Sequence, residues 1–138
     1  MGYVSKSMNW ETYALKLAEI AALKSKDPWQ TVGCCLLRHD HSVASLGYNG
    51  FPAGMKEDWS DRDDRRKYVI HSEVNALRYV KPDECYLAAV TLLPCNDCLK
   101  SLAAYGIKKI VYKDVYKYDP STLKLAEKFE IELIQLNA

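Results

Sequence analysis

Two short motifs constrain the fold of this chain more than any other feature. The first is His71-Ser72-Glu73, and the second is Pro94-Cys95-Asn96-Asp97-Cys98. Each begins a stretch with helical spacing, and the apolar run 85–93 between them has the length of a buried strand. The two cysteines are three residues apart, so both can point to one side of a first helical turn. A helix-strand-helix unit can therefore bring both motifs to one place.

The two motifs together offer the ligands of a catalytic zinc site. We expect His71, Cys95 and Cys98 to bind one Zn²⁺ ion and to leave a fourth position open to water. Glu73 is then free to act as the general acid and base, moving protons between that water and a substrate. Three alternatives remain open: a redox C-x-x-C pair, half of a structural zinc site, and a non-catalytic zinc-binding module, which would not need Glu73.

The rest of the chain alternates helices with strands. Apolar residues follow a helical period over 10–22, and Asn9 can cap that helix. Further helices are expected at 71–80, 95–105 and 121–128, and strands at 31–37, 42–48, 85–93, 109–112 and 130–136. This order predicts a layered α/β fold with a sheet that is mostly parallel toward its C-terminal half. We find no repeat or linker, so we expect a single domain over residues 1–138.

Charge and cysteine content narrow the class of protein. Lys+Arg is 19 and Asp+Glu is 18, a net charge of +1, which favours a small-molecule substrate over nucleic acid. The odd count of five cysteines, without an apolar leader or membrane span, predicts free thiols and a cytoplasmic location. Cys34, Cys35 and Cys85 lie in apolar runs, where we expect them to be buried and unreactive.

The H-x-E and P-C-x-x-C motifs form the signature of zinc-dependent nucleobase deaminases. From about Asn9 to Gln135 the chain resembles the deoxycytidylate (dCMP) deaminases in particular, through segments 25–28, 32–35, 47–54 and 106–112. Free-cytidine deaminases typically have cysteine at the position of His71, and tRNA adenosine deaminases usually have glutamate at that of Leu93. The resemblance implies a three-layer α/β/α cytidine deaminase-like fold, with a five-stranded mixed sheet flanked by helices. It also implies a homohexamer that hydrolyses dCMP to dUMP and ammonia.

The same resemblance suggests how the substrate is held. Asn49 resembles the asparagine that hydrogen-bonds the sugar, and the backbone N–H of Ser72 should bind the pyrimidine 2-keto oxygen. The family usually has alanine at the position of Ser72. Lys26 resembles a basic residue near the substrate phosphate, and Tyr116 a tyrosine that closes over it. The simpler interpretations are a turn at Asn49, a solvated charge at Lys26 and a surface aromatic at Tyr116.

Regulation is a further implication of the family. Many members are activated by dCTP and inhibited by dTTP, which bind with Mg²⁺ at subunit contacts. The loop residues Gly50, Phe51, Pro52 and Gly54 resemble the part that meets this effector, although glycines also suit a plain flexible loop. Residues 55–70 contain no Cys or His, so we expect one zinc ion per chain.

Two substrate questions stay open at this point. The chain can also be interpreted as a deaminase that acts on dCTP or on a modified dCMP. A different class, the editing deaminases of RNA or single-stranded DNA, needs a basic groove and stacking aromatics. The candidates for such a groove are Trp59, Arg62, Arg65, Arg66 and Tyr68, but the neighbouring aspartates cancel most of that charge. We expect a nucleotide as the ligand, and neither nucleic acid nor membrane as a partner.

Overall fold

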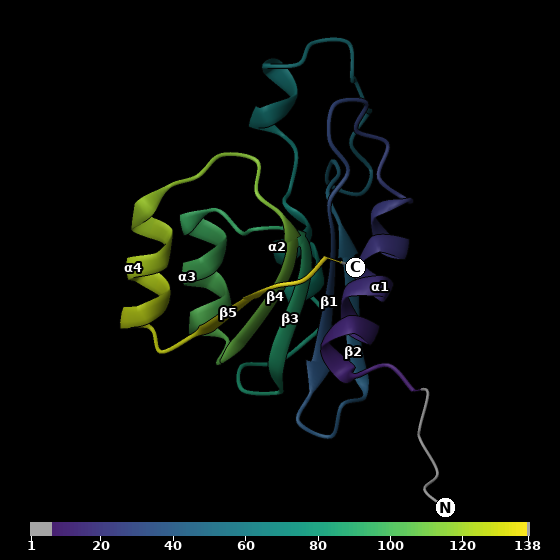
Figure 1. Cartoon of the computed structure of the whole chain (residues 1–138). Helices are drawn as coiled ribbons and strands as arrows, with labels where there is room; N and C mark the ends of the chain where they lie inside the picture. The colour runs from purple at the N-terminus through teal and green to yellow at the C-terminus, as the bar shows by residue number, and fades with distance from the viewer. Residues whose placement is uncertain (1–6, 138) are drawn as a thin grey trace, which may run out of the picture.

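A computed structural model of the protein, which describes residues 7–137, shows one five-stranded sheet with helices on both faces (Figure 1). In chain order the elements are α1 (Trp10–Ala22), β1 (Gly33–Arg38), β2 (Val43–Tyr48), the 3₁₀ helix η1 (Asp64–Lys67), α2 (Ser72–Leu77), β3 (Cys85–Leu92), α3 (Asn96–Ala104), β4 (Lys109–Asp114), α4 (Pro120–Lys128) and β5 (Glu132–Gln135). No helix of residues 7–137 has the length and apolar character needed to cross a membrane.

The strand directions bring distant segments to one edge of the sheet. The strand order is β2-β1-β3-β4-β5, with β1 antiparallel to both neighbours and β3, β4 and β5 parallel to one another. The predicted mixed sheet with a parallel C-terminal half is therefore confirmed. The start of β1 and the ends of β2, β3 and β4 all lie at the same edge, because Gly33 pairs with Tyr48 and Leu92 pairs with Asp114.

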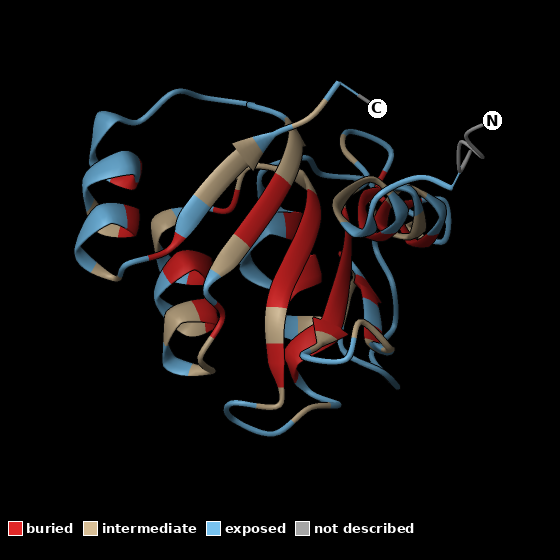
Figure 2. Ribbon diagram, turned by 60° about the horizontal axis from the view of Figure 1, so that its bottom comes forward, coloured by how far each residue is buried: buried red, intermediate tan, exposed pale blue. Residues whose placement is uncertain are grey.

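Alternate residues of the central strands fill two separate cores. Cys34 and Leu36 of β1 face a core shared with α2, α3 and α4. Cys35 and Leu37 face the opposite core, which α1 covers. Figure 2 shows these strands as the most buried part of the sheet. The arrangement confirms the three-layer fold, and Cys34, Cys35 and Cys85 are buried free thiols as expected.

Gly47 of β2 sets how closely α2 lies on the sheet. A Cβ atom at this position would lie 2.4 Å from the carbonyl oxygen of Ser72 and 2.5 Å from the backbone nitrogen of Ala76. Both atoms belong to backbone that cannot easily give way. The absence of a side chain at Gly47 therefore permits the close contact that holds α2, and the residues at its start, against the strand.

Two local predictions differ from the structure. Helix α2 ends at Leu77 rather than near Val80, because the residue before Pro82 disfavours helical backbone and the chain leaves the helix through turns. In the charged loop, η1 was not expected, and Arg65 is buried rather than solvated. That burial removes Arg65 from the surface considered above for nucleic acid.

Candidate active site

Helix starts bring the three predicted metal ligands together. His71 is the N-cap of α2 and Cys95 is the N-cap of α3, with Cys98 one turn further on. Nδ1 of His71 lies 3.3 Å from Sγ of Cys98 and 3.6 Å from Sγ of Cys95. Zinc bonds of about 2.3 Å to sulfur and about 2.0 Å to nitrogen imply tetrahedral N···S separations of about 3.6 Å. The donor set and its spacing fit a zinc ion.

Among residues 7–137, His71, Cys95 and Cys98 form the group of three possible metal-binding side chains whose donor atoms are close enough to hold one ion. Its donor atoms all lie within 4.8 Å of one another. Protein ligands fill three tetrahedral positions, which leaves one position for water or substrate, as in catalytic zinc sites.

The thiol groups of the protein differ in their acidity. The pKa of Cys95 is lowered to about 4, because its sulfur accepts hydrogen bonds from the Cys98 thiol and from His71. The hydrogen bond to Cys95 and burial raise the pKa of Cys98. Elsewhere in the core, burial raises the pKa of Cys35 to about 12 and that of Cys85 to about 11. Thiolate character is therefore concentrated at Cys95.

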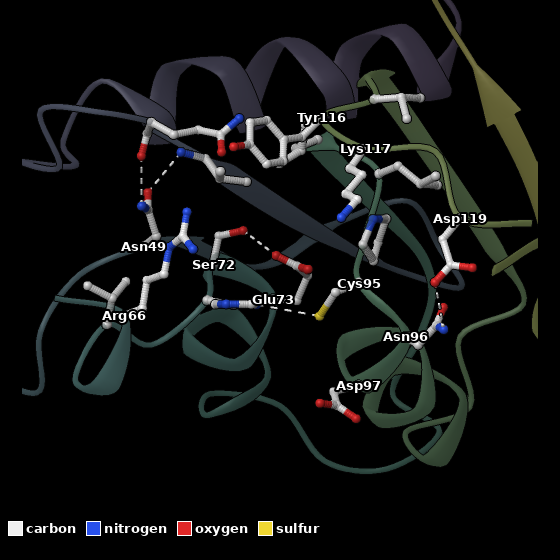
Figure 3. Close-up of a pocket in the computed structure, with 18 of the residues that line it drawn as sticks. Asn49, Arg66, Ser72, Glu73, Cys95, Asn96, Asp97, Tyr116, Lys117 and Asp119 are labelled. Atoms are coloured by element: carbon white, nitrogen blue, oxygen red, sulfur yellow. Dashed lines mark hydrogen bonds between the residues drawn. The ribbon is translucent and has the colours of Figure 1, made fainter. Parts of the chain in front are cut away.

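Glu73 lies beside the three ligands and is held by its neighbour. Its side chain is buried, and Oε1 accepts a hydrogen bond of 2.5 Å from the hydroxyl group of Ser72. Figure 3 shows the carboxylate between Ser72 and Cys95, and Glu73 lines the same cleft as both of them. Glu73 therefore lies near the group of His71, Cys95 and Cys98 but outside it, and its role as general acid and base stays a prediction.

His71, Ser72, Glu73 and Cys95 line a cleft of about 880 Å³ at the edge of the sheet. The rim carries the exposed cations Arg62, Arg66 and Lys117. Tyr116 also lines the cleft, and its hydroxyl group lies 3.4 Å from Nη2 of Arg62. In Figure 3, Arg66 reaches in from one side, while Tyr116 and Lys117 reach in from the other. The rim therefore offers positive charge and hydrogen-bond donors to an anionic ligand.

The predicted substrate-binding residues are divided between two clefts. Ser72 and Tyr116 line the cleft that contains the predicted metal ligands His71 and Cys95, and Asn49 lines both this cleft and a second one. Lys26 instead lines the second cleft and forms an ion pair of 3.2 Å with Glu57. The predicted role of Lys26 near the substrate phosphate stays a prediction, and the position of Lys26 in the second cleft does not favour that role. The loop residues Gly50, Phe51, Pro52 and Gly54 lie in the second cleft as well.

Two sets of cleft residues were not predicted from the sequence. Asp27 and Arg65 form a buried ion pair in the wall, and they are 38 residues apart, so no local spacing reveals them. Asn96 accepts a hydrogen bond from Thr122 and donates to Asp119, which ties the start of α3 to the start of α4. The one available signal for this second set was the position of Asn96 inside the P-C-x-x-C motif.

Comparisons with known proteins agree with this site. The family model for the cytidine and deoxycytidylate deaminase zinc-binding region matches residues 8–114. A probable deoxycytidylate deaminase of Caenorhabditis elegans is 37% identical over an alignment of 107 positions, which covers 71% of this chain and 54% of that protein. The deoxycytidylate deaminase of Homo sapiens is 33% identical over an alignment of 118 positions, which covers 76% of this chain and 65% of that protein. The chain thus spans between about half and two thirds of the length of these relatives.

A solved structure extends the similarity to the whole fold. The dCMP deaminase of cyanophage S-TIM5, solved in complex with dCMP and dUMP, matches with a TM-score of 0.78 and 25% sequence identity. The match covers 91% of this chain and 95% of the phage protein. Together with the family model, whose match includes His71, Cys95 and Cys98, these findings show that the chain belongs to the cytidine and deoxycytidylate deaminase zinc-binding family.

Proposed function

We propose that this protein catalyses the zinc-dependent hydrolysis of dCMP to dUMP and ammonia. The observation that carries the proposal is the buried carboxylate of Glu73 in the same cleft as His71 and Cys95, which form one ligand group with Cys98. A structural zinc site is closed by four protein ligands and needs no acid or base beside it. The phage protein that was solved with dCMP and dUMP supports this choice of substrate.

The residues of the chain account for the proton transfers. When bound, zinc lowers the pKa of a water molecule from about 15.7 to about 7. Glu73 accepts a proton from the attacking water and donates it to N3 of the cytosine ring as oxygen adds to C4. The carboxylate of Glu73 then takes the second proton from that oxygen and delivers it to the amino group, which leaves as ammonia. The backbone N–H of Ser72, in the first turn of α2, has no partner within the helix and is available to the 2-keto oxygen.

The cationic rim supports a nucleotide rather than a nucleoside as the substrate. Arg62, Arg66 and Lys117 surround the mouth of the cleft, where they would neutralise a 5′-phosphate. Tyr116, beside Arg62, would close the same side. Because the rim is exposed, it also leaves room for the alternatives dCTP and a modified dCMP, which a substrate panel separates.

The second cleft is the place where we propose that a regulatory nucleotide binds. It is lined by the cations Lys24, Lys26 and Arg78, and by the loop that contains Gly50 and Phe51. Phe51 stacks on Trp59 with ring centroids 4.3 Å apart. The cations support a phosphate-bearing ligand, dCTP or dTTP, which would be accompanied by Mg²⁺.

We also propose a homohexamer in the cytoplasm. The edge strand β2 exposes Val43, Leu46 and Tyr48, and Tyr79 is 66% exposed beside the second cleft. Such apolar surface is typical of subunit contacts.

The five cysteines are free thiols, as expected in a reducing compartment. The molar mass measured by light scattering tests the assembly, and cell fractionation tests the location.

One experiment tests the proposed activity. Purified protein is incubated separately with dCMP, CMP, deoxycytidine and dCTP, with and without dCTP or dTTP as effector, and ammonia release is measured. We expect turnover of dCMP, and no turnover by a Glu73→Gln variant that still binds zinc and remains folded. Turnover of deoxycytidine but not dCMP would contradict the substrate, whereas full activity of Glu73→Gln would contradict the role of Glu73.

A further inference from the structure

A buried ion pair lies in the wall of the active-site cleft. Nε of Arg65 is 3.1 Å from Oδ1 of Asp27, and their side chains are 9% and 3% exposed. Arg65 also donates a hydrogen bond of 2.7 Å to the carbonyl oxygen of Arg62, and its guanidinium group lies 4.9 Å from the ring centroid of Trp29. Burying two charges is unfavourable unless they are paired and hydrogen-bonded. The pair therefore places η1 firmly against the turn that contains Asp27.

The two oxygen atoms of Asp27 have different partners. Oδ1 accepts hydrogen bonds from the backbone N–H groups of Trp29 and Gln30, at 2.9 Å and 3.2 Å, and from Arg65. Oδ2 accepts one from Nδ2 of Asn49, at 3.3 Å. Oδ1 thus binds the backbone of the turn and the side chain of Arg65, while Oδ2 faces the side chain of Asn49.

These contacts fix the orientation of the Asn49 amide group. Its Nδ2 donates to Asp27 and to the carbonyl oxygen of Gln30, at 2.9 Å, and its Oδ1 accepts from the N–H of Val32, at 2.8 Å. A flipped amide would place a donor against the N–H of Val32 and an acceptor against Asp27 and Gln30. Both amide hydrogens are therefore in use, and Oδ1 alone has capacity left for a further hydrogen bond. Figure 3 shows Asn49 in the cleft.

We propose that Asp27, held by Arg65, is a positioning residue that fixes Asn49 as a hydrogen-bond acceptor and thereby selects nucleotides with a hydroxyl donor on the sugar. This inference rests on the proposed function and deepens it. A 3′-hydroxyl group of the sugar satisfies the remaining lone pair of Oδ1. A sugar without that hydroxyl leaves Oδ1 with the N–H of Val32 as its one donor and the second lone pair of this buried oxygen without a partner, which disfavours such a sugar.

The test compares dCMP with 2′,3′-dideoxycytidine 5′-monophosphate, which lacks the hydroxyl group. In Asp27→Asn one amide atom keeps the bonds of Oδ1, but an NH₂ group then faces Nδ2 of Asn49. We expect the wild-type protein to prefer dCMP by about tenfold or more in kcat/KM. The variant should lose most of that preference through a higher KM for dCMP, with zinc content unchanged and kcat little changed.

Controls separate a positioning role from a general loss of structure. Asp58→Asn changes an exposed aspartate of the loop between β2 and η1, outside both clefts, and should keep the wild-type preference. If Asp27→Asn does not fold, Arg65→Gln serves instead, because it removes the cation and keeps an amide donor. An unchanged preference in whichever variant folds overturns the positioning role. Absence of ammonia release from dCMP by the wild-type protein overturns the proposed function, and this inference with it.

Discussion

The hydroxyl group of Ser72 donates a hydrogen bond of 2.5 Å to Oε1 of Glu73, and both side chains are buried. The bond occupies one carboxylate oxygen and leaves Oε2 for the proton transfers proposed above. It also restricts the rotation of the carboxylate, so Glu73 is held in place before a substrate arrives.

Ser72→Ala tests the contribution of this bond. A hydrogen bond to a charged group contributes about 1.5–3 kcal/mol, so we expect kcat to fall by about tenfold or more. KM for dCMP and zinc content should stay unchanged, because the backbone N–H of residue 72 and the ligand His71 are retained. Ser72→Cys, with a weaker donor, should give an intermediate kcat. Equal kcat values for wild type and Ser72→Ala would exclude a role for the hydroxyl group.

Metal content should depend on Cys95 and not on Cys85. Cys95→Ala removes one of the three donors, and we expect the purified variant to contain little zinc and to unfold at a lower temperature, since metal binding is coupled to folding. Cys85→Ala is the matched control, because Cys85 is a buried thiol outside the ligand group. Zinc is measured by atomic emission on both proteins. A stoichiometric zinc content in Cys95→Ala would contradict the assigned ligands.

Gly47→Ala should loosen the contact between β2 and α2. The added methyl group would lie 2.4 Å from the carbonyl oxygen of Ser72, and such overpacking costs about 1–3 kcal/mol of unfolding free energy. Activity should fall as well, because α2 carries His71 and Glu73. In Gly50→Ala the new methyl group meets nothing within 4 Å, so its unfolding free energy should differ from wild type by less than about 0.5 kcal/mol. Urea denaturation of both variants compares them directly.

The ion pair between Glu11 and Lys109 predicts a pH dependence of stability. Its N···O distance is 3.1 Å and it joins α1 to β4. The pKa of Glu11 is lowered by its own backbone N–H and then by Lys109, so its contribution is present above the ordinary value of 4.5 and is lost as pH falls below it. The pKa of Lys109 is raised, chiefly by the hydrogen bond to Glu11, so its contribution is lost only as pH rises above its ordinary value of 10.5.

Comparing wild type with Glu11→Gln at several pH values checks this. At pH 7 we expect the variant to be less stable by about 0.5–1 kcal/mol, as for other partly exposed pairs. The difference should shrink as the pH is lowered from 5 toward 3. A difference that stays constant over that interval would show that the charge of Glu11 does not contribute.

The sequence predicts the chemical part of the site better than its walls. His71, Glu73, Cys95 and Cys98 lie in two short motifs whose spacing reflects local helical geometry, and the structure brings the three ligands together as expected. Arg65 stands between similar residues, Arg62 and Arg66, and only the fold buries one and exposes the others. Its partner Asp27 is a loop residue with no periodicity to mark it. Long-range pairs of this kind depend on how the sheet edge assembles, which local patterns do not encode.

The proposed catalytic residues and the exposed residues of the cleft lie on different parts of the fold, which affects how substitutions act. The predicted ligands and Glu73 lie at the starts of helices that pack on the sheet, whereas the exposed cleft residues Arg66 and Tyr116 come from connecting segments at its edge. Substitutions in those segments remove little packed apolar area. We therefore expect substitutions at these exposed positions to change the preferred nucleotide while the proposed catalytic residues and the thermal stability are unaffected.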